Sequence, residues 1–153
     1  MSMYFYSKKE DIIKGDKSLN DQAALREIFE DYNHFPPSLH DALNELFSST
    51  GINDKLADKF TKEILSKSKK ILESTYDLIM KYYPYLSEEE SLIITSYKCE
   101  FDDPNYRNYS PYKITNIKLC ENEGIYSIHK YFYLFLKALR KLDRYYPKKK
   151  TYL

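Results

Sequence analysis

The side chains best suited to metal or acid–base chemistry are the three histidines, His34, His40 and His129. His34 and His40 flank a proline pair, and Asp31 and Asp41 stand close to them in the sequence. Metal-binding histidines on a helix often stand four residues apart, or are joined by closely spaced cysteines. No histidine pair here has that spacing and no cysteine joins them. We therefore predict surface or capping histidines at 34 and 40, and no metal site.

Other polar groups also lack the pattern of a known site. The acidic residues Glu100, Asp102 and Asp103 have neither the spacing nor the central glycine of a calcium loop, so we predict a solvated loop. The lysines at 148–150 form only a short basic end, and the tyrosines are not interleaved with a basic stripe, which argues against nucleic acid as a partner. No catalytic residue is predicted, and cofactor-binding residues stay unknown.

His129 stands beside an apolar stripe and is predicted to pack at the edge of a helix. The most apolar helical pattern in the chain runs over residues 126–146. Ser127 is the predicted N-cap of this helix. Its apolar side chains recur at steps of four and three: Ile128, Phe132, Phe135, Leu139, Leu142 and Tyr146. Tyr131, Leu134 and Ala138 widen the stripe, which is typical of a helix packed on several sides.

Cap residues predict the other helices. Ser18, Ser38 and Ser87 each precede an acidic residue by three positions, which is the pattern of a helix start. Residues 54–82 form the longest helical pattern, with one lysine-rich face, and residues 100–109 are predicted to be a polar loop before a short helix that starts at Ser110. The fold class predicted is all-α, with about six helices packed around a long C-terminal amphipathic helix. The domains predicted are an N-terminal arm, 1–17, and a single helical domain, 18–153.

Composition limits the class of protein. The chain has 153 residues, 42% hydrophobic and 31% charged, with a net charge of +1, which is typical of one globular domain without a field that attracts nucleic acid or an anionic membrane. The N-terminus lacks a signal-peptide pattern and no apolar run is long enough to cross a bilayer. Cys99 and Cys120 are too few for a disulfide framework. We expect a cytoplasmic protein.

Three segments from Leu86 onward carry a resemblance: LSEEESLIITSY (86–97), SPYKITNIKL (110–119) and SIHKYFYLFLKALRKLDRYYPKKKTYL (127–153). In this order they resemble the helical front half of protozoan mono-ADP-ribosyltransferase-like domains. There, a Leu-(Ser/Thr)-x-acid-acid helix start is followed by a Ser-Pro-Tyr segment and a long amphipathic helix. The resemblance implies that strands bearing an arginine, a Ser-Thr-Ser and a Glu-x-Glu would follow Leu153, and that NAD is the cofactor of the whole family but not of this chain.

Similar motifs occur earlier in the chain, in the order that the family uses. They are Arg26, Phe47-Ser48-Ser49-Thr50 and Glu121-Asn122-Glu123. Their contexts are a helix interior, a helix end and a turn, whereas a dinucleotide site of this type needs groups that converge from neighbouring strands. We predict that they do not form an active site.

Three hypotheses follow. The first is a catalytically silent helical portion of an ADP-ribosyltransferase-like protein, whose partner is the absent catalytic half or a target protein, with self-association possible. The alternative is a self-contained helical protein-interaction module that uses the helix at 54–82. The third is a small complete enzyme built on Arg26, Ser49 and Glu123.

Overall fold

A computed structural model describes the backbone of residues 16–150 and the side chains of residues 23–142. Within these limits the chain is entirely helical and contains no strand, which confirms the all-α class. There are eight α-helices and one 3-10 helix, more than the six predicted: α3 (Asp16–His34), α4 (Leu39–Ser48), α5 (Asp54–Ser74), α6 (Tyr76–Tyr82), α7 (Glu88–Lys98), η1 (Pro104–Tyr109), α8 (Pro111–Cys120), α9 (Gly124–Ser127) and α10 (His129–Lys150). The predicted arm at 1–17 lies almost wholly outside the described residues.

Side-chain caps start three of the helices. The Ser38 hydroxyl accepts a hydrogen bond from the Asp41 N–H at 3.1 Å, and the Asn53 side chain accepts one from the Leu56 N–H at 2.8 Å. At α7 the Ser87 hydroxyl accepts from the Glu90 N–H, while the Glu90 carboxylate accepts from the Ser87 N–H. Such caps stabilise a helix start by about 1 kcal/mol each. The predicted starts of α4, α5 and α7 are thereby confirmed.

Two other predicted caps form different bonds. Ser110 stands at the N-cap position of α8, but its hydroxyl donates to the Arg107 carbonyl at 2.7 Å. Ser127 ends the short helix α9 and donates to the Gly124 carbonyl at 2.7 Å, so the prediction that it caps the last helix is wrong. That helix begins at His129, after a break at Ile128. A serine hydroxyl that can turn back to a nearby carbonyl does so in competition with capping.

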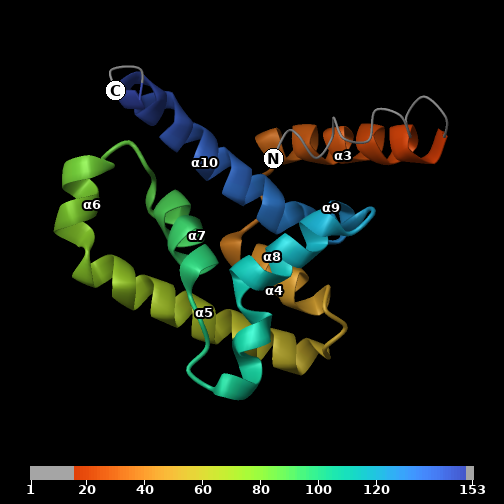
Figure 1. Ribbon diagram of the computed structural model, residues 1–153, viewed down its shortest axis with the longest axis horizontal. Helices are drawn as coiled ribbons and strands as arrows, with labels where there is room; N and C mark the ends of the chain where they lie inside the picture. The colour runs from red at the N-terminus through yellow and green to blue at the C-terminus, as the bar shows by residue number, and fades with distance from the viewer. Residues whose placement is uncertain (1–15, 151–153) are drawn as a thin grey trace.

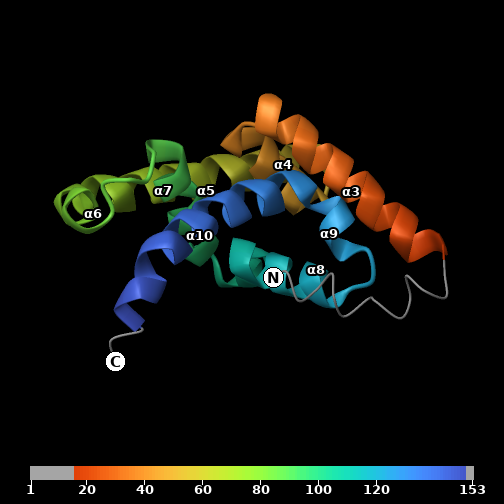
Figure 2. The ribbon, with the colours of Figure 1, turned by 90° about the horizontal axis from the view of Figure 1, so that it is seen from above.

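The core lies where α4, α5, α7 and α10 meet (Figure 1). Five consecutive residues of α10, from Tyr131 to Phe135, are buried, because neighbouring helices cover that helix on several sides. Seen from above, α10 runs diagonally across the molecule, with α5 and α6 on one side of it and α8 on the other (Figure 2). The Tyr131 side chain is fully buried, and its hydroxyl lies 3.2 Å from the Ser96 hydroxyl. Burial of a polar tip is tolerated here because it has a hydrogen-bond partner.

A cluster of three phenylalanines joins α4 and α5 to the connection after α7. The ring centroids of Phe60 and Phe101 are 4.6 Å apart, and those of Phe47 and Phe60 are 5.6 Å apart. Phe101 is only 1% exposed, although it belongs to the segment 100–109 that was predicted to be a polar loop. The burial of Phe101 is not predictable from the sequence, because its neighbours are polar and a single apolar residue shows no periodicity.

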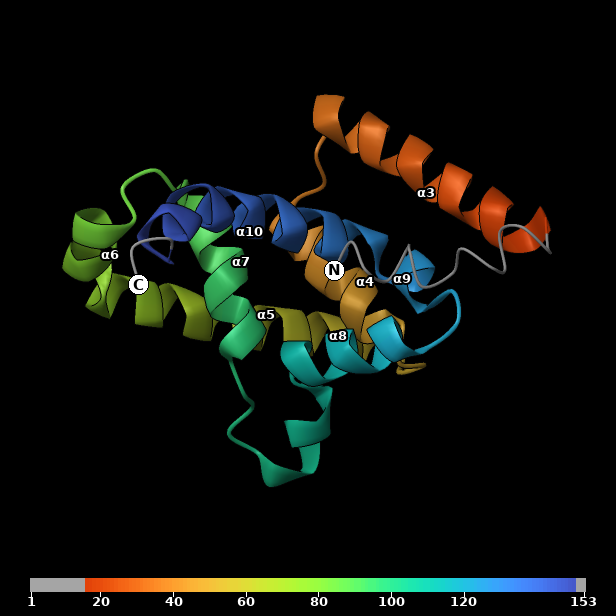
Figure 3. The same cartoon turned by 45° about the horizontal axis from the view of Figure 1, so that its top comes forward.

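The single long helix predicted over 54–82 is wrong. It breaks at Thr75, whose φ and ψ are −111° and 9°. The hydroxyls of Ser74 and Thr75 both donate to the Ile71 carbonyl, at 2.9 and 2.8 Å. Such back-bonding competes with the helix and bends it. The chain then turns into α6, which lies at the end of α5 (Figure 3), and none of the side chains of α6 is buried.

No helix among the described residues combines the length and the apolarity needed to cross a membrane.

We expect the Phe101→Ala substitution to lower the free energy of unfolding by about 3 to 5 kcal/mol, because it removes a buried ring and leaves a cavity between Phe47 and Phe60. Phe35→Ala is the matched control, since the Phe35 side chain is 82% exposed and should cost less than about 0.5 kcal/mol. Urea denaturation followed by circular dichroism measures both. Equal effects of the two substitutions would contradict the anchoring role of Phe101.

Candidate functional site

The structure places the two neighbouring histidines on different helices. His34 is the exposed last residue of α3. His40 is exposed on α4, with its Nδ1 3.9 Å from an Asp41 oxygen and its Nε2 3.7 Å from an Asp58 oxygen. Among the described residues, no three histidine, cysteine or acidic side chains gather as metal ligands would. His40 therefore lies beside two surface carboxylates, and exposed contacts of this kind contribute little to stability.

The acidic segment after α7 is used by the fold. The Lys67 ammonium donates to the Glu100 carbonyl and to the Asp102 carboxylate, at 2.6 Å each. The Asp103 carboxylate accepts from the Asn105 N–H at 2.9 Å and so starts η1. The contacts of Lys67 with Glu100 and Asp102 thus attach the connection that carries Phe101 to α5.

The residues similar to the NAD-site motifs of the resembled family lie in helices and turns. Arg26 is exposed in the middle of α3. The hydroxyls of Ser49 and Thr50 donate to the Leu46 and Phe47 carbonyls, both at 2.6 Å, and so close the end of α4. Glu121, Asn122 and Glu123 form the turn before α9, where Glu123 has a φ of 64°. The described residues contain no strand, so they lack the neighbouring strands from which such groups converge in a dinucleotide site of this type.

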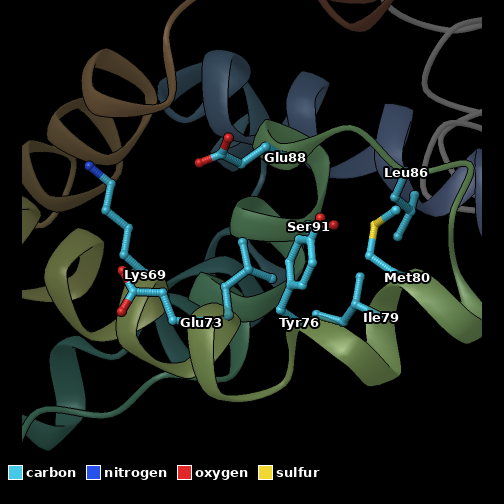
Figure 4. A pocket seen from close by; sticks show the side chains of 9 residues that line it. Lys69, Glu73, Tyr76, Ile79, Met80, Leu86, Glu88 and Ser91 are labelled. Carbon is cyan, nitrogen blue, oxygen red and sulfur yellow. The ribbon is translucent and has the colours of Figure 1, made fainter.

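A groove of about 440 Å³ lies between α6 and the neighbouring parts of α5 and α7 (Figure 4). Its apolar wall is formed by Leu72, Tyr76, Ile79, Met80 and Leu86. Met80 and Leu86 lie close together at one end, whereas Lys69 and Glu73 lie toward the other. The charged lining residues are Lys69, Glu73 and Glu88, with two carboxylates to one ammonium. This arrangement suits an apolar ligand surface with a cationic end.

The apolar character of α6 extends beyond the groove. Asp77 and Lys81 stand four residues apart and share one narrow side of the helix. Leu78 and Tyr82, with the same spacing, are 59% and 58% exposed on another side. Of the eight exposed large apolar side chains in the described part of the chain, five lie between residues 71 and 82: Ile71, Tyr76, Leu78, Met80 and Tyr82. This concentration makes the segment 71–82 the candidate surface for an interaction.

A set of hydrogen-bonded polar side chains joins α3, α4 and α10. His129 Nε2 lies 3.2 Å from a Glu45 carboxylate oxygen, and His129 Nδ1 lies 2.7 Å from the Tyr32 hydroxyl. The other Glu45 oxygen accepts from the Lys130 N–H at 2.9 Å. The side chains of Glu45 and His129 are 19% and 20% exposed. His129 therefore packs at a helix edge, as predicted, but it does so as the middle of a hydrogen-bonded chain.

Burial disfavours the charged forms of Glu45, His129 and Tyr32. It raises the pKa of Glu45 to about 7, against the lowering effect of the Lys130 N–H and ammonium. It lowers the pKa of His129, and the Lys130 charge adds to that lowering. Burial, followed by the Glu45 charge, raises the pKa of Tyr32 to about 12. All three directions follow from the removal of ionised groups from water.

Tyr32, His129 and Glu45 are connected in the order of a nucleophile, a base and an orienting acid. A nucleophilic hydroxyl must lose its proton readily, whereas Tyr32 holds its proton more tightly than a free tyrosine does. The three side chains also do not line the groove between α5, α6 and α7. The supported role of Tyr32, His129 and Glu45 is to attach the end of α3 to α4 and α10.

Sequence reasoning missed Glu45 and Tyr32. Glu45 stands on α4 beside the buried residues Ala42 and Leu46, so an acid at the flank of an apolar face was the available signal. Tyr32 and His129 are 97 positions apart, and no local pattern connects them. The groove was missed for a similar reason, because it depends on the break at Thr75, which sets α6 beside α5 and α7.

Comparisons of the chain with models of protein families, with curated proteins and with solved structures give no match.

We expect Glu45→Gln to make the stability less dependent on pH. Folding raises the Glu45 pKa from 4.5 to about 7, so its contribution is fully present below pH 4.5 and is lost as the pH rises through 7. Between pH 5 and pH 8 the wild type should therefore lose up to about 3 kcal/mol relative to the variant. Urea unfolding at both pH values tests this.

Glu30→Gln, at an exposed acid of α3, is the control and should follow the wild type. A pH dependence of Glu45→Gln equal to that of the wild type would show that Glu45 is not the group responsible.

Proposed function

We propose that this chain is a helical protein-interaction module, which binds an amphipathic helix of a partner protein in the groove between α6, α5 and α7. The observation that carries the proposal is the exposure of Ile71, Tyr76, Leu78, Met80 and Tyr82 on one continuous segment. A helix that is apolar on more than one side is normally buried. Since no side chain of α6 is buried within the chain, a partner would supply the missing contact.

The charges around the groove support a particular kind of partner. Glu73 and Glu88 outnumber Lys69 among the lining residues, and Glu89 is exposed beside Glu88 at the start of α7. The partner helix would therefore place apolar side chains against Met80 and Leu86 and a lysine or arginine near Glu73 and Glu88. Apolar anchors at positions i, i+3 or i+4 and i+7 are the usual pattern of helix-in-groove recognition.

The test is selection of helical peptides from a displayed library on the wild-type chain, with counter-selection on Met80→Asp. We expect the selected peptides to share apolar residues at helical spacing and a basic residue toward one end. Met80→Asp should weaken their binding at least roughly tenfold, measured by fluorescence anisotropy, because a carboxylate would be buried in the apolar wall.

Ile117→Asp is the matched control. Ile117 lies on α8 and is 58% exposed, so the same change away from the groove should leave peptide affinity unaltered. Peptides that bind Met80→Asp as well as the wild type would contradict the proposal. A wild type that sediments as a dimer, with Met80→Asp a monomer, would assign the groove to a second copy of the chain and would also contradict it.

A second candidate is the helical portion of an ADP-ribosyltransferase-like protein. What supports it is the resemblance of residues 86–97, 110–119 and 127–153, together with the packing of the helices concerned: α7 contacts both α8 and α10. In that case the partner would be a strand-bearing catalytic domain that binds NAD, and this chain would be silent by itself.

Isothermal titration of the purified chain with NAD separates these candidates from a complete small enzyme. We expect no heat of binding, because Arg26, Ser49 and Glu123 belong to separate helices and turns. A micromolar dissociation constant that Glu123→Gln abolishes would show that these residues form a cofactor site after all. An unchanged constant in that variant would place NAD elsewhere in the chain.

A further inference from the structure

A second cavity lies between α7, α10 and the connection from α3 to α4. Its volume is about 320 Å³, which is at the lower end of the range for small-molecule pockets. Three parts of the chain line it, with Pro36 from the connection, Glu89 and Ile93 from α7, and Leu134 and Lys137 from α10. No residue of this lining also lines the groove beside α6, so the cavity is a separate candidate site.

The floor of the cavity is apolar and belongs to the main core. Ile93 and Leu134 are only 1% and 7% exposed, and their positions are set by the packing of α7 against α10. Pro36, which is exposed, adds an apolar wall whose ring has little conformational freedom. A small hydrocarbon group can therefore be received here with little reorganisation of the protein.

Four charged side chains border this apolar floor, and two of them are already satisfied. The Glu90 carboxylate accepts from the Lys141 ammonium at 2.7 Å and from the Ser87 N–H at 2.8 Å. Glu89 of α7 and Lys137 of α10 form no ion pair with each other or with another residue of the described part of the chain. The lining thus offers one carboxylate and one ammonium to a ligand.

The combination of these features is informative, although neither charge would be a site by itself, because water satisfies a single exposed charge. Opposite charges stand on two helices that pack together, and they share one apolar floor. A free amino acid with an apolar side chain carries the complementary groups: an ammonium, a carboxylate and a hydrocarbon chain in one compact molecule. A residue inside a polypeptide has neither backbone charge, and a residue at a chain terminus has only one of them.

We propose that this cavity binds a free amino acid with an apolar side chain of about the size of leucine. The Glu89 carboxylate accepts from the ammonium of the ligand, the Lys137 ammonium donates to its carboxylate, and its side chain packs on Ile93, Leu134 and Pro36. The bound ligand bridges α7 and α10 and so stabilises the contact between them. This site goes beyond the protein interaction proposed for the groove and does not depend on it.

The experiment follows the backbone amide signals of the isotope-labelled chain by nuclear magnetic resonance during titration with L-leucine. We expect saturable shifts of the signals of Ser87, Ile93 and Leu134, which line the cavity, with a dissociation constant on the order of 1 mM. The signals of Ile79 and Met80, which line the groove, should not shift.

Three related molecules test each part of the ligand. N-acetyl-L-leucine lacks the positive charge, L-leucinamide lacks the negative charge, and glycine lacks the side chain. Each should bind roughly fivefold more weakly than L-leucine, because it leaves one part of the lining without its partner.

Two substitutions connect each charge of the ligand with one residue. Glu89→Gln should weaken the binding of L-leucine roughly fivefold and leave that of N-acetyl-L-leucine unchanged, since this molecule has no ammonium for Glu89 to bind. Lys137→Gln should weaken the binding of L-leucine by a similar factor and leave that of L-leucinamide unchanged.

Glu88→Gln and Arg140→Gln are the matched controls. Both residues are exposed on the same two helices and neither lines the cavity, so loss of either charge should leave the affinity for L-leucine unaltered. Circular dichroism establishes that all four variants are folded.

Three results would overturn the proposal. The first is the absence of saturable shifts in the cavity at ten times the expected dissociation constant, or shifts in the groove instead. The second is N-acetyl-L-leucine or L-leucinamide that binds as tightly as L-leucine, which would assign the cavity to a chain terminus. The third is a loss of affinity in the control variants as large as that in Glu89→Gln and Lys137→Gln.

Discussion

The burial of the first turns of α10 is the constraint on which the rest of the structure depends. Residues 131–135 are all buried, so helices must cover α10 on several sides, and α4, α7, α9 and α3 do so. The fully buried Tyr131 hydroxyl requires a partner, which Ser96 of α7 supplies at 3.2 Å. This bond and the surrounding apolar contacts set α7 against α10. Glu90, also on α7, accepts from the Lys141 ammonium at 2.7 Å and ties the same two helices together nearer the start of α7.

At the centre of the molecule the apolar side chains are buried and the buried polar groups have partners within the chain. The candidate surfaces for binding or movement therefore lie at its two ends. At one end α6 carries exposed apolar side chains on more than one side and borders the groove with α5 and α7. At the other end α3 covers a small apolar cluster and is held by two tyrosine hydroxyls. Both ends are built from fewer apolar contacts than the core, which is the usual condition for segments that move or bind.

The distribution of titratable groups follows the same division. In the segment after α7, the Asp102 carboxylate pairs with Lys67, the Asp103 carboxylate starts η1, and the Glu100 carboxylate accepts from the Tyr112 hydroxyl. His34 and His40, the histidines that first suggested metal chemistry, lie at the surface of different helices. Glu45 and His129 differ from them because both side chains are about four-fifths buried and face one another. The protonation of Glu45 and His129 is therefore linked to the packing of α3.

The sequence by itself determined the all-α class, the starts of α4, α5 and α7, and the buried stripe that begins at Ile128 and continues along α10 to Ala138. These depend on local rules, since caps act over three residues and an apolar stripe repeats with the turn of the helix. Only the tertiary structure decided the break at Thr75, the burial of Phe101 and the meeting of Tyr32, Glu45 and His129. Tyr32 and Glu45 reach His129 from positions 97 and 84 residues earlier, and Phe101 packs on rings of α4 and α5, which lie far from it in the sequence. Contacts of this kind follow from how whole helices pack, and no periodicity within one segment encodes them.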